Sequence, residues 1–333
     1  MKQRYYYLLG RITLFIITGF FLTYRTYSQH LIFGNEKTKW EVGLNFGPSF
    51  FLGDLGGNAG KGATVFLKDL NLQFTKMMKG AFITMYPNKW LGLRVAADLT
   101  YLEGDDAVIN TMGIDELWRK QRNLNFRTNV WEAYGSFELF PLMFLKRNSE
   151  YEPRLRPYVL FGLGIFHFNP QGSLTDANGN KSWYNLQPLK TEGEGMTEYP
   201  NSKPYNLTQM NIPVGGGLKF YISERFNFGA ELLYRKTFTD YIDDVSKNYI
   251  DAGNFIKYMP AQNAALATQL SDKTIGIIYP GMTRWEPGAM RGDKKQSDTY
   301  FSVVLKLGIQ LGQVYDNSYD RRAARQTRCP VVY

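Results

Sequence analysis

This sequence is poor in histidine and cysteine, the residue types that most often serve as a catalytic base or a thiol nucleophile. There are two histidines, His30 and His167, and one cysteine, Cys329. A serine or cysteine nucleophile needs a nearby base, usually a histidine, and neither histidine has a recognisable partner. His167 comes just before Asn169 and Pro170, and we interpret it as an exposed rim residue near the end of a strand. We therefore expect no enzymatic activity, and we assign no catalytic residue and no cofactor.

Two acidic groups have the carboxylates that bind a hard cation such as calcium. They are Glu103, Asp105 and Asp106, and then Asp240, Asp243 and Asp244. Neither group has a complete calcium-loop signature, so we interpret both as solvated loops and predict no metal site. Gly162–Gly164 and Gly215–Gly217 are not phosphate-binding loops, because no helix is expected after them. We expect these glycines to relieve crowding or to let strands bend.

The elements that would position such residues follow from a period-two alternation of apolar and polar residues. It recurs in eight segments, at 40–47, 79–86, 91–100, 127–139, 157–168, 209–221, 227–235 and 300–310. A strand with one face toward lipid and the other toward a polar interior has this pattern. The last segment shows it most clearly, with Leu305 and Leu307 on one face and Lys306 and Gly308 on the other.

The connections between these segments alternate in length. Long segments follow the odd strands, at about 51–74, 103–124, 169–208 and 239–298. Shorter links follow the even strands, at 87–89, about 140–156 and 222–225. This asymmetry is typical of outer-membrane barrels. The sequence therefore predicts an all-β fold, an eight-stranded antiparallel up-and-down transmembrane barrel with long extracellular loops and both termini in the periplasm.

A soluble β-sandwich is the main competing fold, because its strands also alternate. Two features favour the barrel. The polar face combines charges with many glycines, as a narrow lumen requires, and aromatic residues such as Trp40, Trp90, Trp131 and Tyr234 lie near strand ends, as in interfacial girdles. After the N-terminus, the sequence has no run of about 18 apolar residues, which excludes a helical membrane protein.

Eight charged residues fall on the inward face of the predicted strands. They are Glu41, Arg94, Asp98, Glu132, Lys219, Glu231, Arg235 and Lys306. At eight strands the interior is just wide enough for side chains to fill it, and buried charges are costly unless they are paired. We interpret the set as a salt-bridge plug that keeps the barrel closed. A polar conduit for solutes is the alternative.

The N-terminus has the order of a secretory signal peptide. Positive residues come first, Ile12–Leu22 is apolar, and Thr26 and Ser28 are small residues before a cut at Gln29. We predict that residues 1–28 are a signal peptide, rather than an N-terminal membrane anchor, and that 29–313 form the barrel. The net charge is +9, but four of the cations leave with the signal peptide and the rest are scattered. We therefore expect no nucleic-acid partner.

Residues 314–333 lie beyond the last predicted strand and are expected to form a periplasmic tail. The tail contains Arg321, Arg322, Arg325, Arg328 and Cys329. It is either a frayed, solvated end or a docking segment that contacts a partner. In an oxidising compartment its single thiol could form an intermolecular disulfide.

Several motifs resemble one known family. The most specific is the twelve-residue run Arg235–Ser246, RKTFTDYIDDVS; others are Phe166–Pro170, Pro188–Leu189 and Thr191–Gly195. Together they are similar to the PorG-type outer-membrane barrels of the type IX secretion system, over nearly the whole mature chain. Shorter pieces that fit as well are Arg122–Leu124, Phe126–Arg127, Leu270–Asp272 and Arg291–Gly292.

The resemblance implies a non-enzymatic role in the bacterial outer membrane. Barrels of this family are thought to tether a periplasmic ring of PorK lipoprotein and PorN, which serves protein export and, in some bacteria, gliding motility. The expected partners are thus outer-membrane lipids and PorK/PorN-like proteins, with the tail as the expected contact. Two alternatives remain open: a receptor or rim-site enzyme that acts through the long loops, and a passive channel.

Overall fold

The computed structural model of this 333-residue chain describes residues 38–55, 74–109, 113–145 and 152–311. Eight strands form the wall of a barrel: β1 (Lys39–Leu52), β2 (Lys76–Asn88), β3 (Leu91–Asp105), β4 (Asn125–Leu139), β5 (Leu155–His167), β8 (Thr208–Tyr221), β9 (Phe226–Thr237) and β10 (Thr299–Leu311). Each is antiparallel to its neighbours, in the order β3-β2-β1-β10-β9-β8-β5-β4. Pairing of β3 with β4, from Leu91↔Leu139 to Asp105↔Asn125, closes the ring. The predicted eight-stranded antiparallel barrel is confirmed.

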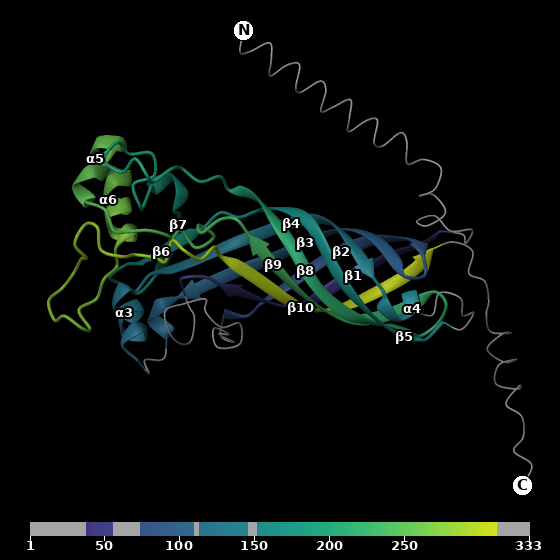
Figure 1. The fold of residues 1–333 in the computed structure, drawn as a ribbon. Coiled ribbons are helices and arrows are strands. Elements are labelled where there is room, and N and C mark those ends of the chain that lie inside the picture. The colour runs from purple at the N-terminus through teal and green to yellow at the C-terminus, as the bar shows by residue number, and fades with distance from the viewer. Residues whose placement is uncertain (1–37, 56–73, 110–112, 146–151, 312–333) are drawn as a thin grey trace, which may run out of the picture.

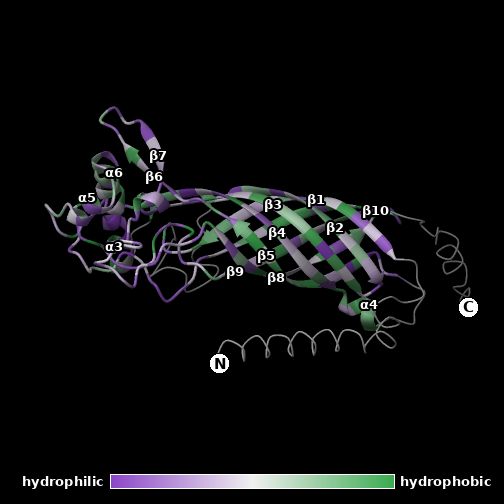
Figure 2. Ribbon diagram, turned by 90° about the horizontal axis from the view of Figure 1, so that it is seen from above, coloured by the Kyte–Doolittle hydropathy of each residue, from purple (hydrophilic) through white to green (hydrophobic). Residues whose placement is uncertain are grey.

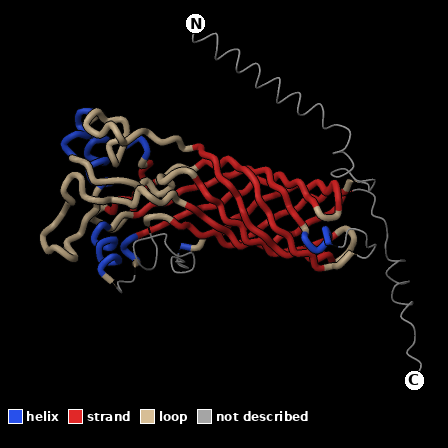
Figure 3. The backbone as a smooth tube through the Cα atoms, viewed as in Figure 1, coloured by secondary structure: helices blue, strands red, loops and turns tan. Residues whose placement is uncertain are grey.

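The two ends of the barrel differ, as Figure 1 shows. At one end, which we call the turn end, strands are joined by the short connections, β1 begins and β10 ends. The short helix α4 (Pro141–Leu145) also lies there. At the other end, the loop end, the long connections form a folded mass of helices and loops (Figure 3).

The long connections contain elements that the alternation did not predict. They are η2 (Asp106–Val108), α3 (Ile114–Arg122), β6 (Gln171–Thr175), β7 (Lys181–Asn185), η3 (Gln187–Leu189), η4 (Ala252–Asn254), α5 (Phe255–Tyr258) and α6 (Ala261–Ser271). The sequence of α6, AQNAALATQLS, consists largely of good helix formers. The hairpin β6–β7 extends the sheet beyond β4, with Arg127 paired to Gln171. These loops are thus a structured cap on the barrel.

Along each wall strand, side chains that are exposed on the outside of the barrel alternate with side chains that are buried inside it. On β10, Leu305 and Leu307 are 67% and 64% exposed, whereas Val304 and Lys306 are each 2% exposed. The same alternation of hydropathy is visible along the strands in Figure 2. The first tight turn lies at Lys89–Trp90, slightly later than expected, because β2 continues through Asn88 with an irregular register after Met85.

Candidate functional site

The structure brings the eight predicted inward charges together inside the barrel. Each of them, from Glu41 on β1 to Lys306 on β10, is at most 2% exposed. Glu138 on β4 lies among them and is fully buried. It is a ninth charged residue of the interior, beyond the eight of the predicted plug. The inward set therefore contains five acids and four bases.

Lys219 and Arg94 organise the part of this network nearer the turn end. The Nζ of Lys219 lies 3.0 Å from Glu41 Oε1, 3.2 Å from Glu138 Oε2 and 2.5 Å from Tyr86 Oη. Arg94 pairs with Glu138 and, at 2.7 Å, with Glu231. A cation inside the barrel thus always has at least one carboxylate beside it, which offsets the cost of burying it.

Arg235 organises the part nearer the loop end. Its Nη2 donates to Glu132 Oε1 at 2.7 Å and to Asp98 Oδ2 at 3.1 Å. The other oxygen of Glu132 accepts from Asn211 Nδ2 at 3.0 Å and from Tyr300 Oη at 2.5 Å. Lys306, 3.2 Å from Glu231, belongs with Arg94 and Lys219. The ion pairs thus form two sets along the interior, one around Lys219, Arg94 and Lys306 and one around Arg235.

Glycines at inward positions make room for these long side chains. A Cβ placed on Gly43 would lie 2.4 Å from the ring of Phe82, and one on Gly80 would lie 1.9 Å from Asp98 Oδ1. A Cβ on Gly308 would lie 2.7 Å from Glu41 Oε1. Real contacts of this kind are essentially never so short, and protein interiors leave little room to shift. The inward glycines are therefore part of the packing of the lumen.

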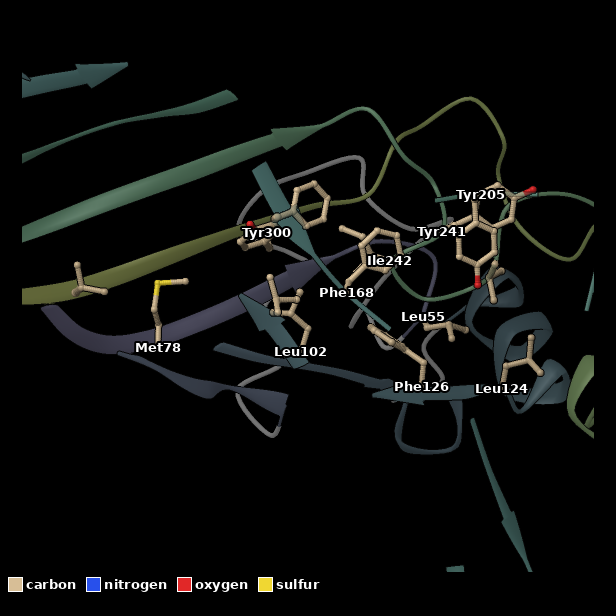
Figure 4. Close-up of a cluster of buried hydrophobic side chains, with 14 residues drawn as sticks. Leu55, Met78, Leu102, Leu124, Phe126, Phe168, Tyr205, Tyr241, Ile242 and Tyr300 are labelled. Carbon is tan, nitrogen blue, oxygen red and sulfur yellow. The ribbon is translucent and has the colours of Figure 1, made fainter. Parts of the chain in front are cut away.

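Apolar layers lie at both ends of the charged interior. At the loop end, one buried cluster is formed by side chains from the loops and from the parts of the strands nearest to them (Figure 4). It includes Met78, Phe126, Phe168, Ile242 and Tyr300. At the turn end, a second cluster contains Tyr86, Phe140, Tyr158 and, from α4, Met143. The buried charges thus lie between two clusters of apolar and aromatic side chains, and Tyr86 and Tyr158 of the turn-end cluster also bond to the charged residues.

Beyond the loop-end layer, buried ion pairs tie the loops together in the loop cap, which we define as the described residues of 53–55, 106–124, 168–207 and 238–298. Arg122 donates to both carboxylate oxygens of Asp106, at 2.8 and 3.1 Å, and to the backbone oxygens of Asp54 and Arg291. Arg291 in turn donates to Glu192 Oε1 at 2.9 Å. These two arginines connect all four long loops.

The interpretation of the acidic groups as solvated loops is wrong for three residues. Asp106, Asp243 and Asp244 are fully buried. They face inward because they satisfy backbone and arginine donors: Asp243, for example, accepts from the backbone nitrogens of Leu55 and Val245. The sequence shows the acids but not which donors they meet, such as Leu55 from another loop or Arg122, 16 positions after Asp106.

Several of these cap carboxyl groups have strongly shifted pKa values. Burial, reinforced by Asp244 and Glu192, raises the pKa of Glu194 to about 8. Burial and the nearby Asp243 raise the pKa of Asp240 to about 9, and burial and Asp54 raise that of Asp243 well above its usual value. The packed cap therefore retains protons that the same groups would lose in water.

The described residues show no catalytic constellation. His167 stacks on Trp131 at 5.3 Å, and its Nδ1 lies 3.0 Å from Thr208 Oγ1. Within the ranges described, no group of three or more histidine, cysteine or acidic side chains could hold a metal ion. In the same ranges, no helix combines the length and the apolar character needed to cross a membrane.

Two further predictions fall outside the described residues. They are the signal peptide at 1–28 and the tail at 314–333, which includes Arg321, Arg322, Arg325, Arg328 and Cys329.

The run Arg235–Ser246, which resembles the PorG family, lies within the described residues. It leads from Arg235 in the lumen to Asp243 and Asp244 in the cap, and so joins the two buried ion-pair systems.

Comparison with known proteins gives matches only among solved structures. No protein-family model matches the sequence, and no curated protein matches it. The outer membrane protein OprG from Pseudomonas aeruginosa is 9% identical, with a TM-score of 0.36, over 85% of this chain and 100% of its own. A major outer membrane protein from Thermus thermophilus is 9% identical, with a TM-score of 0.35, over 83% of this chain and 100% of its own.

Ail, the attachment invasion locus protein of Yersinia pestis, is a third match. It is 8% identical, with a TM-score of 0.32, over 82% of this chain and 97% of its own. The assignment of this chain as a closed eight-stranded barrel rests on its own strand pairing.

Proposed function

We propose that this protein is a non-enzymatic anchor in the bacterial outer membrane, and that it serves type IX secretion by holding a periplasmic ring of PorK/PorN-like proteins. The observation that carries the proposal is a barrel with an apolar exterior and a filled interior. Such a barrel fits a role in which the protein is held in the membrane without conducting solutes.

The exterior supports a location in lipid. Its exposed residues are large and apolar on strands around the wall, for example Leu44, Val95, Leu163 and Leu305, each more than 60% exposed. So wide an apolar surface on a closed wall is unfavourable in water. The strands have 12 to 15 residues, and a tilted transmembrane strand needs about 9 to 11.

The orientation follows the usual rule that short turns face the periplasm and long loops face outward. The turn end would then face the periplasm, together with both termini. A ring partner would meet the turn end and the tail, where we place the contact with Arg321, Arg322, Arg325, Arg328 and Cys329. The family resemblance of the sequence, and not the fold, supports the choice of PorK/PorN-like proteins.

Deletion of the gene tests the role. We expect loss of export of proteins that carry type IX sorting signals, with normal insertion of other outer-membrane barrels. Export at the wild-type level in the deletion strain would contradict the proposal. Co-purification of PorK-like and PorN-like proteins with the wild-type chain, lost when residues 314–333 are removed, would place the contact in the tail.

The possible disulfide is tested separately. A Cys329→Ser strain should lose any high-molecular-weight adduct on non-reducing gels if this thiol links the chain to a partner. Equal recovery of partners from both strains on such gels would show that the contact is not covalent.

A receptor role for the loops is the second candidate. The observation that favours it is an open cavity of about 260 Å³ in the loop cap, lined by residues that include Tyr199, Lys247 and Tyr249. A Tyr249→Ala strain with normal export but impaired uptake or adhesion would support this role over that of an anchor.

A further inference from the structure

A second cavity lies at the turn end, in the mouth of the barrel. Aromatic rings of Tyr86, Phe140 and Tyr221 line it, together with the end of β2 at Pro87 and Asn88 and the turn residue Lys89. The free space is about 30 Å³. A single water needs about 10–15 Å³ on this measure, so the cavity has room for about two waters or one small polar group.

Three cations meet one carboxylate at this cavity. Glu152 accepts from Arg156 Nη2 at 2.7 Å and lies 3.4 Å from Lys89 Nζ. Lys39 lines the same space. Burial alone would raise the pKa of Glu152, but the charges of Arg156, Lys39 and Lys89 outweigh it and hold the pKa below its usual value. Among the described residues that line it, the cavity thus has two more positive charges than negative ones.

The whole described turn end shares this basic character. Its exposed or half-buried charged residues are Lys39, Lys89, Arg154, Arg156 and Arg225, against Glu152 and Glu224. A potential of this sign attracts anions from the surrounding solvent and steers them to the mouth. The positive potential is strongest in the cavity, because buried aromatic rings form the floor of the cavity. Near such rings, opposite charges attract more strongly than in water.

The cavity is reached from the barrel axis and not from the lipid. Its strand residues Lys39, Tyr86, Arg156, Tyr221 and Gln310 occupy the inward-facing positions of five different strands, in phase with buried residues of the lumen. Lipid headgroups surround the outer wall of a barrel, whereas the mouth faces the aqueous compartment. An occupant of the mouth is therefore more readily part of a soluble chain than of a lipid.

We propose that the mouth cavity binds an acidic side chain, aspartate or glutamate, of a periplasmic partner protein. A carboxylate matches the size of the space. Arg156 and Lys89 would then pair with the bound carboxylate as well as with Glu152. The stem of Arg156 is already held in place, since its guanidinium lies 4.1 Å from the centre of the Tyr221 ring. The proposal rests on the proposed function for the compartment that the mouth faces, and it adds a binding site on the barrel itself.

The test measures binding of a fluorescein-labelled peptide of alternating glutamate and glycine to the mature full-length protein in detergent, by fluorescence anisotropy at low salt. We expect Arg156→Gln to weaken binding about fivefold, as loss of one ion pair implies. Glu152→Gln should strengthen it by a similar factor, because it removes the competing carboxylate. Arg154→Gln, which removes an exposed cation outside the cavity, is the matched control and should change binding less than twofold.

The opposite signs expected for the two cavity variants separate direct binding from damage to the fold. If Glu152→Gln weakens binding as Arg156→Gln does, or if Arg154→Gln has the same effect as Arg156→Gln, the proposal is wrong. Should Arg156→Gln fail to fold, a Lys39→Gln/Lys89→Gln double variant replaces it, with the same expected direction. A peptide with glutamine in place of glutamate should not bind.

Two other occupants would overturn the proposal. Binding of the peptide only to a chain that ends at residue 311 would show that the protein's own C-terminal segment fills the mouth. Competition by inorganic phosphate at much lower concentrations than by acetate would indicate a phosphate group instead. Peptide binding is measured independently of export in the deletion strain. If the peptide does not bind but the deletion blocks export, only this inference is rejected. If the peptide binds but the deletion strain exports normally, only the proposed function is rejected.

Discussion

Replacement of Arg235 by methionine tests whether ion pairs hold the lumen together. The side chain of Arg235 is fully buried, and it is paired with both Glu132 and Asp98. Methionine fills most of the volume but leaves two carboxylates facing one another without a cation. Removal of one partner from a buried pair costs about 3–5 kcal/mol, and we expect a loss of this size in the free energy of unfolding.

A second change should restore most of this loss. In the double variant Arg235→Met/Glu132→Gln, one base and one acid disappear together, and the amide can still accept from Asn211 and Tyr300, as Glu132 does. Replacement of a whole buried pair is often close to neutral. We therefore expect the double variant to be more stable than Arg235→Met by about 2 kcal/mol or more. The control is Lys236→Met, because Lys236 is the next residue on β9 and is exposed; a change within about 0.5 kcal/mol is expected there.

The measurement is reversible unfolding in urea from phospholipid vesicles, followed by tryptophan fluorescence and by the mobility shift of unheated samples on gels. The sequence has six tryptophans, and neither variant changes any of them. A loss below about 1 kcal/mol for Arg235→Met would refute the argument. So would a double variant that is less stable than Arg235→Met, since the carboxylate would then not be the source of the loss.

Three further predictions follow from the packing, the cap and the lumen. Gly43→Ala should destabilise the barrel by about 1–3 kcal/mol through overpacking, whereas Gly135→Ala, where a Cβ would have no neighbour within 4 Å, should be neutral in the same urea assay. The cap should lose protection against hydrogen exchange as the pH rises from about 4 to 8, because the pKa of Glu194 is raised to about 8 in the packed state and a raised acid pKa gives stability that is lost with rising pH; Glu194→Gln should flatten this dependence. In planar bilayers the wild type should show only leak, and alanine at both Arg94 and Glu138 should raise the conductance; equal traces would contradict a lumen closed by these side chains.

The alternation predicted every wall strand, because each residue of such a strand faces one of two very different surroundings. It also predicted which charged residues face inward, since that depends on the parity of their position alone. It could not predict their partners. Arg94 meets Glu231 and Lys219 meets Glu41 only because strand register and barrel tilt bring distant strands to the same height.

The loop cap was the least predictable part. Arg122 and Arg291 have no periodic surroundings, and nothing near them in the sequence marks them as buried. Their partners are distant in sequence: Asp106 lies 16 positions before Arg122, and Glu192 and the backbone of Asp54 belong to other loops. Good helix formers predominate in 261–271 and in 114–122 and are a local signal of helices there, but the place of these helices on the barrel depends on contacts that span the chain.

The span of the lumen ion pairs has a consequence for assembly. Lys219 and Glu41 are 178 positions apart, and Arg94 and Glu231 are 137 apart. Such contacts contribute only after long stretches of chain have been ordered, which makes folding slow. A partly inserted sheet would present these charges to lipid without their partners, at a high free-energy cost. Insertion and ring closure should therefore occur as a single concerted event, and before it the same charges keep the unfolded chain hydrated.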